Sequence, residues 1–104
     1  MSHNIIILHE SSTNQIYKCC NHYNLNYKNL FFQFTKKEFD IFTETLRSLQ
    51  PHHFEHTHPE GLKALILNTK LPGKLGFTQE EVSKIISDIE QALIMNEIFA
   101  SLSN

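Results

Sequence analysis

The first third of the chain alternates apolar and polar positions, which is typical of antiparallel strands with one buried face. If Lys28 and Asn29 are the central residues of a hairpin turn, the apolar residues on its two arms lie opposite one another. The pairs are Tyr27 with Leu30, Leu25 with Phe32, and Tyr23 with Phe34. A shift of one residue would put these side chains opposite polar ones, so the pattern predicts the hairpin in this register.

Two later segments have the spacing and the first-turn chemistry of amphipathic helices. Thr35 with Glu38, and Thr78 with Glu81, each form the Thr-x-x-Glu pattern of a capping box. The apolar residues that follow recur at helical spacing. They are Phe39, Phe42, Leu46 and Leu49 in the first helix, and Val82, Ile85, Ile86, Ile89, Ala92 and Leu93 in the second. We therefore expect two helices, the first of which ends before Pro51.

Four further segments, residues 4–9, 15–20, 62–68 and 74–77, read as strands bounded by turn signals such as Pro72-Gly73. The chain is expected to fold as one α+β domain over residues 1–104. Its antiparallel sheet would have about five or six strands and carry both helices on one face. The two capping patterns are offset by 43 residues. An internal hairpin-helix duplication would explain this offset, and so would two helices that acquired similar caps independently.

Some apolar residues exceed what this fold can cover. Residues 5–8 and 64–67 are apolar runs without alternation, which indicates strands buried on both faces. Beyond Leu93, apolar side chains spread around most of the second helix. The cover could come from this chain's own sheet or from a second molecule. The candidate interface residues are Phe31, Ile66, Ile94, Met95, Ile98 and Phe99. We expect an interaction module that forms a homo-oligomer, most simply a homodimer, or binds a protein partner.

Length and composition agree with this interpretation. The chain has 104 residues, of which 40% are hydrophobic and 19% charged, as in one ordinary soluble globular domain. Its longest apolar runs have four residues, far fewer than the roughly 20 that cross a bilayer, so no membrane span is expected. The N-terminus lacks the basic segment of a signal peptide. Cys19 and Cys20 are too close for an unstrained disulfide, and two reduced thiols suit a cytoplasmic protein.

A histidine-rich segment at residues 51–60 is an alternative functional site. It holds four of the seven histidines, His52, His53, His56 and His58. Two imidazoles on one helical or strand face could bind zinc or nickel, but a stable site needs three or four ligands held rigidly. The prolines at both ends favour neither a helix nor a strand, so the competing interpretation is a solvated loop.

Nucleic-acid binding is a second alternative. Tyr17 and Phe31 could stack on bases of a single strand while Lys18, Lys28 and Lys63 contact phosphates. The net charge is -2 and the chain has one arginine, so no global attraction for nucleic acid is expected.

Linear motifs give no support for catalysis or for a bound cofactor. Cys20 and His22 would share a strand face, but no acid follows to orient the imidazole. The three glycines do not have the spacing of a phosphate-binding loop. We therefore predict no catalytic residues and no cofactor.

A combination of these features resembles a known family. A strand ending in Cys19-Cys20 precedes the hairpin, and the helix after it opens with Glu38-Phe39 followed by Phe42, an E-F-x-x-F motif. Together they resemble a family of small, uncharacterised bacterial proteins, a domain of unknown function, over most of residues 5–95. The resemblance implies a shared fold and no activity.

Overall fold

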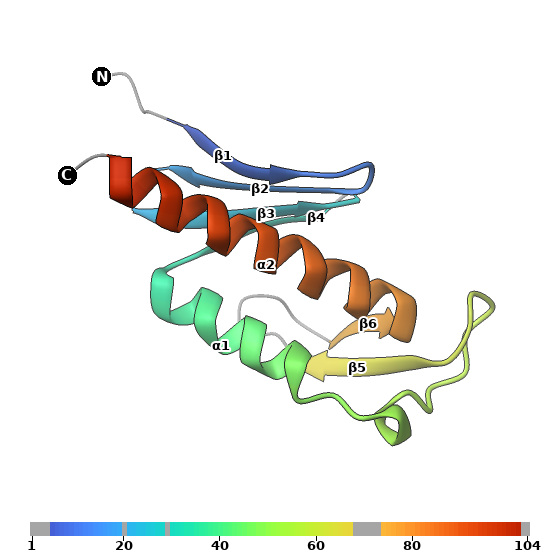
Figure 1. The fold of residues 1–104 in the computed structure, drawn as a ribbon. Helices are drawn as coiled ribbons and strands as arrows, with labels where there is room; N and C mark the ends of the chain where they lie inside the picture. The colour runs from blue at the N-terminus through green and yellow to red at the C-terminus, as the bar shows by residue number, and fades with distance from the viewer. Residues whose placement is uncertain (1–4, 20, 29, 68–73, 103–104) are drawn as a thin grey trace.

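The computed structural model describes residues 5–19, 21–28, 30–67 and 74–102. Figure 1 shows an α+β fold in which two helices cover a larger sheet and a separate hairpin lies at one end of the helices. The strands are β1 (Ile6–Glu10), β2 (Asn14–Cys19), β3 (His22–Tyr27), β4 (Leu30–Phe34), β5 (Lys63–Leu67) and β6 (Lys74–Thr78). The helices are α1 (Lys36–Arg47), the short 3-10 helix η1 (Pro51–His53) and α2 (Gln79–Leu102). Within the described residues, no helix is long and apolar enough to cross a membrane.

The larger sheet has four antiparallel strands in the order β1-β2-β3-β4. The expectation of five or six strands in one sheet is therefore wrong, because β5 and β6 pair with each other in a sheet of their own. This hairpin lies beside the C-terminal end of α1 and the start of α2 (Figure 1). A pattern of apolar and polar residues predicts that a segment is a strand. Which other strand it pairs with depends on where the helices place the two segments in space.

The hairpin of β3 and β4 has the register that the sequence predicts. Tyr27 pairs with Leu30, and Leu25 pairs with Phe32. Lys28 adopts a φ of 53°, in the left-handed region that two-residue hairpin turns use. The prediction of the register is therefore confirmed, because the turn and the apolar alternation both favour it.

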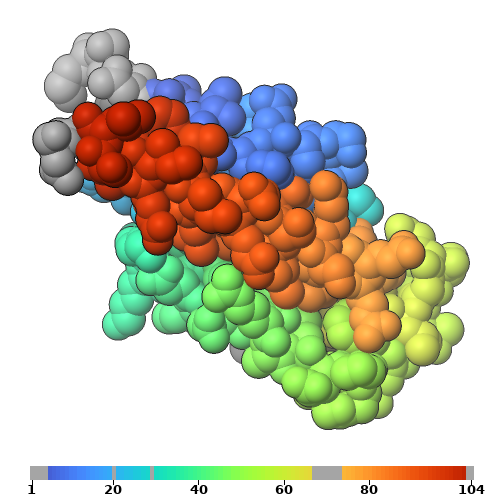
Figure 2. Space-filling view, viewed as in Figure 1, coloured from blue at the N-terminus to red at the C-terminus, as the bar shows by residue number. Residues whose placement is uncertain are grey.

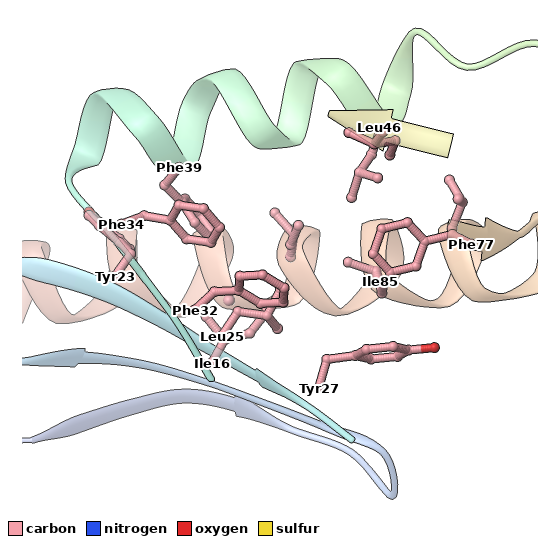
Figure 3. Close-up of a cluster of buried hydrophobic side chains, with 14 of the residues drawn as sticks. Ile16, Tyr23, Leu25, Tyr27, Phe32, Phe34, Phe39, Leu46, Phe77 and Ile85 are labelled. Carbon is pink, nitrogen blue, oxygen red and sulfur yellow. The ribbon is translucent and has the colours of Figure 1, made fainter. Parts of the chain in front are cut away.

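Both helices lie on the same face of the four-stranded sheet, α2 over β1 and β2, and α1 over β3 and β4. Their capping boxes form as expected: Glu38 N–H bonds to Thr35 Oγ1, and Glu81 N–H to Thr78 Oγ1. A hydrophobic contact also brackets the first cap, with the Phe34 and Phe39 ring centroids 5.9 Å apart. The hydrophobic core fills the space between sheet and helices (Figure 3).

The two continuous apolar runs differ from their expected burial. In β5, burial alternates: Ala64 and Ile66 lie in the core and Leu65 is exposed. In the other run only Leu8 is buried, while Ile5, Ile6 and Ile7 leave 36 to 61% of their surface exposed. Within the described residues β1 has no strand on its outer side, so this apolar segment lies at a sheet edge.

Candidate functional site

The last turns of α2 form an exposed apolar surface. With 24 residues, α2 is about 36 Å long, whereas the five- and six-residue strands beneath it span roughly 20 Å. The helix therefore extends beyond the core that it covers. Five side chains of its last three turns are 37 to 76% exposed. We call them the α2 apolar surface: Ile94, Met95, Ile98, Phe99 and Leu102.

This surface has a defined orientation on the helix. Ile85, Ile89 and Ala92 point into the core, and helical spacing places Met95 and Phe99 next to that stripe. Glu90 and Glu97, which are seven residues apart, lie on another side of the helix, where Arg47 Nη2 of α1 is 3.9 Å from Glu90 Oε1. The α2 apolar surface therefore contains no charged residue.

The exposed start of β1 continues the same surface. Ile6 pairs across the sheet with Lys18, whose Nζ donates to Asn96 Oδ1 on α2 at 3.1 Å. Ile6 therefore lies beside the helical turn that carries Met95 and Phe99. Figure 2 shows the last turns of α2 next to the N-terminal end of β1 on one side of the molecule. Two elements from opposite ends of the chain thus form one apolar area.

A buried polar cluster fixes β1 against α2. Asp88 is 2% exposed, and its Oδ1 lies 2.8 Å from His9 Nε2 and 3.4 Å from Lys84 Nζ. Its Oδ2 accepts hydrogen bonds from Ser11 Oγ at 3.1 Å and from Asn14 Nδ2. Burial alone would raise the pKa of Asp88, but the bonds from Asn14, His9 and Ser11 and the charge of Lys84 lower it. The carboxylate therefore stays ionised and holds the β1–β2 turn on the helix.

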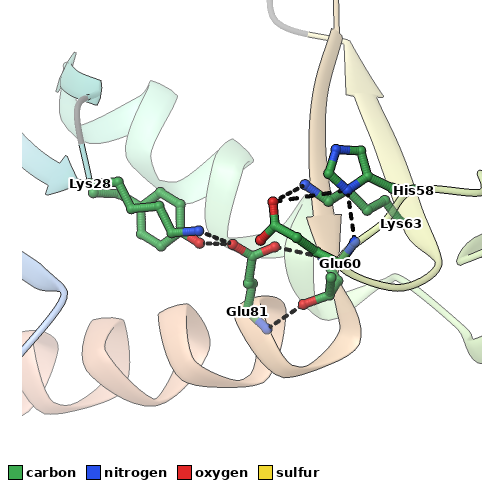
Figure 4. A network of polar contacts seen from close by, with 7 residues as sticks. Lys28, His58, Glu60, Lys63 and Glu81 are labelled. Atoms are coloured by element: carbon green, nitrogen blue, oxygen red, sulfur yellow. Dashed lines mark hydrogen bonds and ion pairs between the residues drawn. The ribbon is translucent and has the colours of Figure 1, made fainter.

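A second polar cluster surrounds the first turn of α2 (Figure 4). Glu81 Oε2 accepts hydrogen bonds from Tyr27 Oη and, at 2.9 Å, from Lys28 Nζ, while Oε1 accepts from Thr78 N–H at 2.9 Å. Burial opposes ionisation of Glu81, yet these donors lower its pKa to about 2. Burial and the neighbouring Glu81 carboxylate raise the pKa of Tyr27 to about 12, against the opposing effect of Lys28.

A shallow cavity of about 270 Å³ adjoins this second cluster. Its lining carries both signs of charge. The lining residues are Thr13, Tyr27, Lys28, Glu60, Thr78, Glu80, Glu81 and Lys84. Since Lys28 already pairs with Glu81, and Lys84 with Asp88, the two lysines of the lining are engaged in holding the fold. The contacts of Tyr27 and Lys28 with Glu81 attach the end of β3 to the start of α2.

The structure separates the candidate interface residues. Ile94, Met95, Ile98 and Phe99 share one helix, and all are exposed. Phe31 is 78% exposed but lies on β4, at the opposite edge of the sheet from β1. Ile66 is 8% exposed and belongs to the core, because the β5–β6 hairpin turns this side chain inward. Ile66 is therefore unavailable for an interface.

The histidine-rich segment is partly ordered by its own histidines. His53 Nδ1 accepts a hydrogen bond from the Gln50 N–H at 2.8 Å, and His58 Nδ1 accepts one from the Glu60 N–H at 3.1 Å. The rings of His52 and His53 are 4.1 Å apart, while His56 forms a β-bridge with Lys63. Across the described ranges, no three side chains of His, Cys, Asp or Glu are grouped as ligands for one metal ion.

The residues considered for nucleic-acid binding do not share a surface. Register and strand alternation place Tyr17 and Phe31 on the face of the sheet away from the helices. Lys18 points to the helix side and bonds to Asn96, and Lys28 bonds to Glu81. Lys63 lies on the separate hairpin, 3.8 Å from Glu60. The aromatic residues and the cations are therefore on different sides of the molecule.

A turn at Asn21 separates Cys19, at the end of β2, from His22, at the start of β3. Asn21 has a φ of 65°, and Cys19 pairs with His22 across β2 and β3. The pair that the sequence suggested, Cys20 with His22, involves a residue outside the described ones. No sequence pattern indicated the Asp88 cluster, because His9, Ser11 and Asn14 lie more than 70 positions from Asp88 in the chain. The one available signal was Asp88 itself, a polar residue within the apolar stripe of α2.

Comparison with known proteins identifies the family to which the chain belongs. A family model described as a family of unknown function, DUF6686, matches residues 1–91. No curated protein and no solved structure matches the chain. The match covers the four-stranded sheet, both hairpins and α2 as far as Gln91, so it agrees with the resemblance seen in the sequence. Because the model spans most of the chain, the protein belongs to this family of unknown function, DUF6686.

Proposed function

We propose that the protein is a self-associating interaction module and that the α2 apolar surface, with Ile6 beside it, is where two copies meet. The observation that supports this proposal is the concentration of exposed apolar side chains on one side of α2 and on the adjoining strand. By contrast, most exposed residues of α1 are charged, and Ile41 is the one exposed large apolar side chain of this helix. A cytoplasmic location accords with this function.

Charge favours a second copy as the partner. The α2 apolar surface contains no charged residue, so a two-fold arrangement brings no like charges together. An uncharged surface also offers nothing to attract a strongly charged partner. Several apolar side chains withdrawn from water at roughly 25 cal/mol per Å² supply a driving force for association.

The size of the area agrees with a dimer interface. Ile6 together with the α2 apolar surface exposes six large apolar side chains on one side of the molecule. A typical monomer has a largest apolar patch of roughly 300 to 600 Å². A standard interface takes roughly 800 Å² from each partner, so six half-exposed side chains provide part of what one copy must contribute.

The test is the mass in solution of the wild type and of Ile98→Glu, measured by sedimentation at micromolar concentration. We expect a dimer for the wild type and a folded monomer for the variant, because two buried carboxylates would face each other across the interface. Ile41→Glu is the matched control, since Ile41 is 58% exposed on α1, and this variant should remain dimeric. A wild-type monomer, or a dimer unaffected by Ile98→Glu, would contradict the proposal.

A further inference from the structure

We infer that two copies associate by antiparallel pairing of their β1 strands, centred on Ile6, to give one continuous sheet of eight strands. This inference rests on the proposed self-association and specifies its geometry. The two four-stranded sheets would join edge to edge around a two-fold axis perpendicular to the sheet. The two α2 helices would then pack against each other on the helix-bearing side.

The edge of β1 is open to such pairing. In the described residues no strand pairs with its outer side, so alternate residues of the segment direct N–H and C=O groups away from β2. Natural edge strands are commonly protected by lysine, proline or a bulge. Residues 5–7 contain neither lysine nor proline, and the bulge lies after them, between Ile7 and His9.

The sequence of this edge is complementary to itself in one register. A two-fold axis at Ile6 places Ile6 opposite Ile6 of the other copy, and Ile5 opposite Ile7. Two residues that oppose each other in an antiparallel pair have their side chains on the same face of the sheet. A two-fold axis perpendicular to the sheet must therefore pass between one residue and the same residue of the other copy. Centring it on Ile7 would draw the bulge at Leu8 into the pairing. Centring on Ile6 uses three β-branched residues, which favour strands.

The position of α2 satisfies the same axis. α2 packs on both β1 and β2 and crosses them obliquely, with its last turns near the start of β1 (Figure 1). The two-fold axis lies half a strand spacing outside β1, so the last turns of the two α2 helices would lie on either side of this axis, on the same face of the joined sheet. Their facing sides would carry Met95, Ile98 and Leu102.

The other edge lacks these properties. Phe31 and Leu30 on β4 are exposed, but the helix next to that edge is α1. Its solvent side carries Lys36, Lys37 and Asp40, which a two-fold axis would bring near their own copies. An interface at β1 buries uncharged side chains from both layers, whereas one at β4 would desolvate charges.

Disulfide trapping tests the pairing in the full-length chain with Cys19→Ser and Cys20→Ser as background. Opposed residues of antiparallel strands have Cα atoms roughly 4.5 to 5.5 Å apart, within the range of a disulfide. Mild oxidation of Ile6→Cys should therefore give a covalent dimer at least tenfold faster than Ile41→Cys, the exposed control on α1. A mixture of Ile5→Cys and Ile7→Cys should cross-link faster than either variant alone.

The outcomes separate this inference from the proposed function. If sedimentation shows a wild-type dimer but Ile6→Cys reacts no faster than Ile41→Cys, the edge pairing is wrong and self-association stands. If the wild type is a monomer, both fail. Hydrogen exchange of the unmodified protein provides a second measurement that needs no variant. Those amides of residues 5–7 that point away from β2 should exchange at least tenfold more slowly in the dimer than after dilution to the monomer, and equal rates for them would overturn the pairing.

Discussion

His9 in β1 and Asp88 in α2 are 79 positions apart in the chain, yet His9 Nε2 lies 2.8 Å from Asp88 Oδ1. A carboxylate only accepts hydrogen bonds, so Nε2 carries the proton and donates it. Asn14 and Ser11 donate to the other oxygen. The turn between β1 and β2 is thereby attached to the middle of α2. This attachment sets the position of β1 next to the α2 apolar surface.

We predict that Asp88→Asn lowers the free energy of unfolding by about 2 to 4 kcal/mol. The substitution keeps the shape but replaces one acceptor oxygen by an NH₂ group, which then faces another buried donor. Urea unfolding followed by circular dichroism measures the change. Asp40→Asn is the control, because Asp40 also pairs with a lysine one helical turn away but is 55% exposed. Its loss should stay below about 0.5 kcal/mol, and equal losses in the two variants would contradict the prediction.

We predict that acid destabilises the fold through Glu81. The pKa of Glu81 is lowered from 4.5 to about 2 in the folded protein, so its stabilising effect is complete above pH 4.5. That effect is lost as the pH falls from about 4.5 towards 2, because the unfolded chain then binds the proton more readily. Glu81→Gln should reduce the slope of unfolding free energy against pH over this range.

Glu38→Gln is the matched control for this pH dependence. Glu38 occupies the same position in the other capping box, where its Oε1 accepts from the Thr35 N–H at 2.9 Å. Glu81 has in addition the donors Tyr27 and Lys28. The control should keep most of the wild-type slope, and an unchanged slope in Glu81→Gln would refute the assignment.

At high pH, we predict that Tyr27 makes the fold sensitive to alkali. Its pKa is raised from 10 to about 12 on folding, so the folded protein retains the proton where the unfolded chain loses it. The stabilising effect is complete below pH 10 and is lost as the pH rises from about 10 to 12. Ultraviolet absorbance of tyrosinate follows the titration, and Tyr27→Phe should remove the component near pH 12. Burial, the largest cause of the raised pKa, remains in Glu81→Gln, so this variant should move the component only part of the way towards pH 10. No movement at all would contradict the contribution assigned to Glu81.

For the start of α2, we predict that Thr78→Ala costs about 1 kcal/mol of stability through the loss of the cap. The hydroxyl of Thr78 accepts from the Glu81 N–H at 3.1 Å. Thr78→Ser retains this acceptor and should lose much less. Thermal unfolding of the two variants makes the comparison, and equal losses would show that the methyl group of Thr78, rather than its hydroxyl, is what stabilises the helix start.

The local features of this protein follow from the sequence alone. The hairpin register around Lys28 and the capping boxes at Thr35 and Thr78 depend on residues within a few positions of one another. For such neighbours the geometry of a strand or a helix already decides which side chains meet. The same reasoning identified Ile94 and Ile98 as apolar residues beyond the core-facing stripe of α2, and both are exposed.

The contacts between distant segments were decided by the tertiary structure alone. The pattern of residues 64–67 indicated a strand, but only the packing of the β5–β6 hairpin turned Ile66 into the core. Nothing near Ile5 in the chain indicates that β1 is an edge strand, since strand order depends on where the whole sheet ends. Asp88 meets His9 for the same reason. Contacts across more than 70 positions are set by the arrangement of the layers, which a local pattern of hydrophobic and polar residues does not specify.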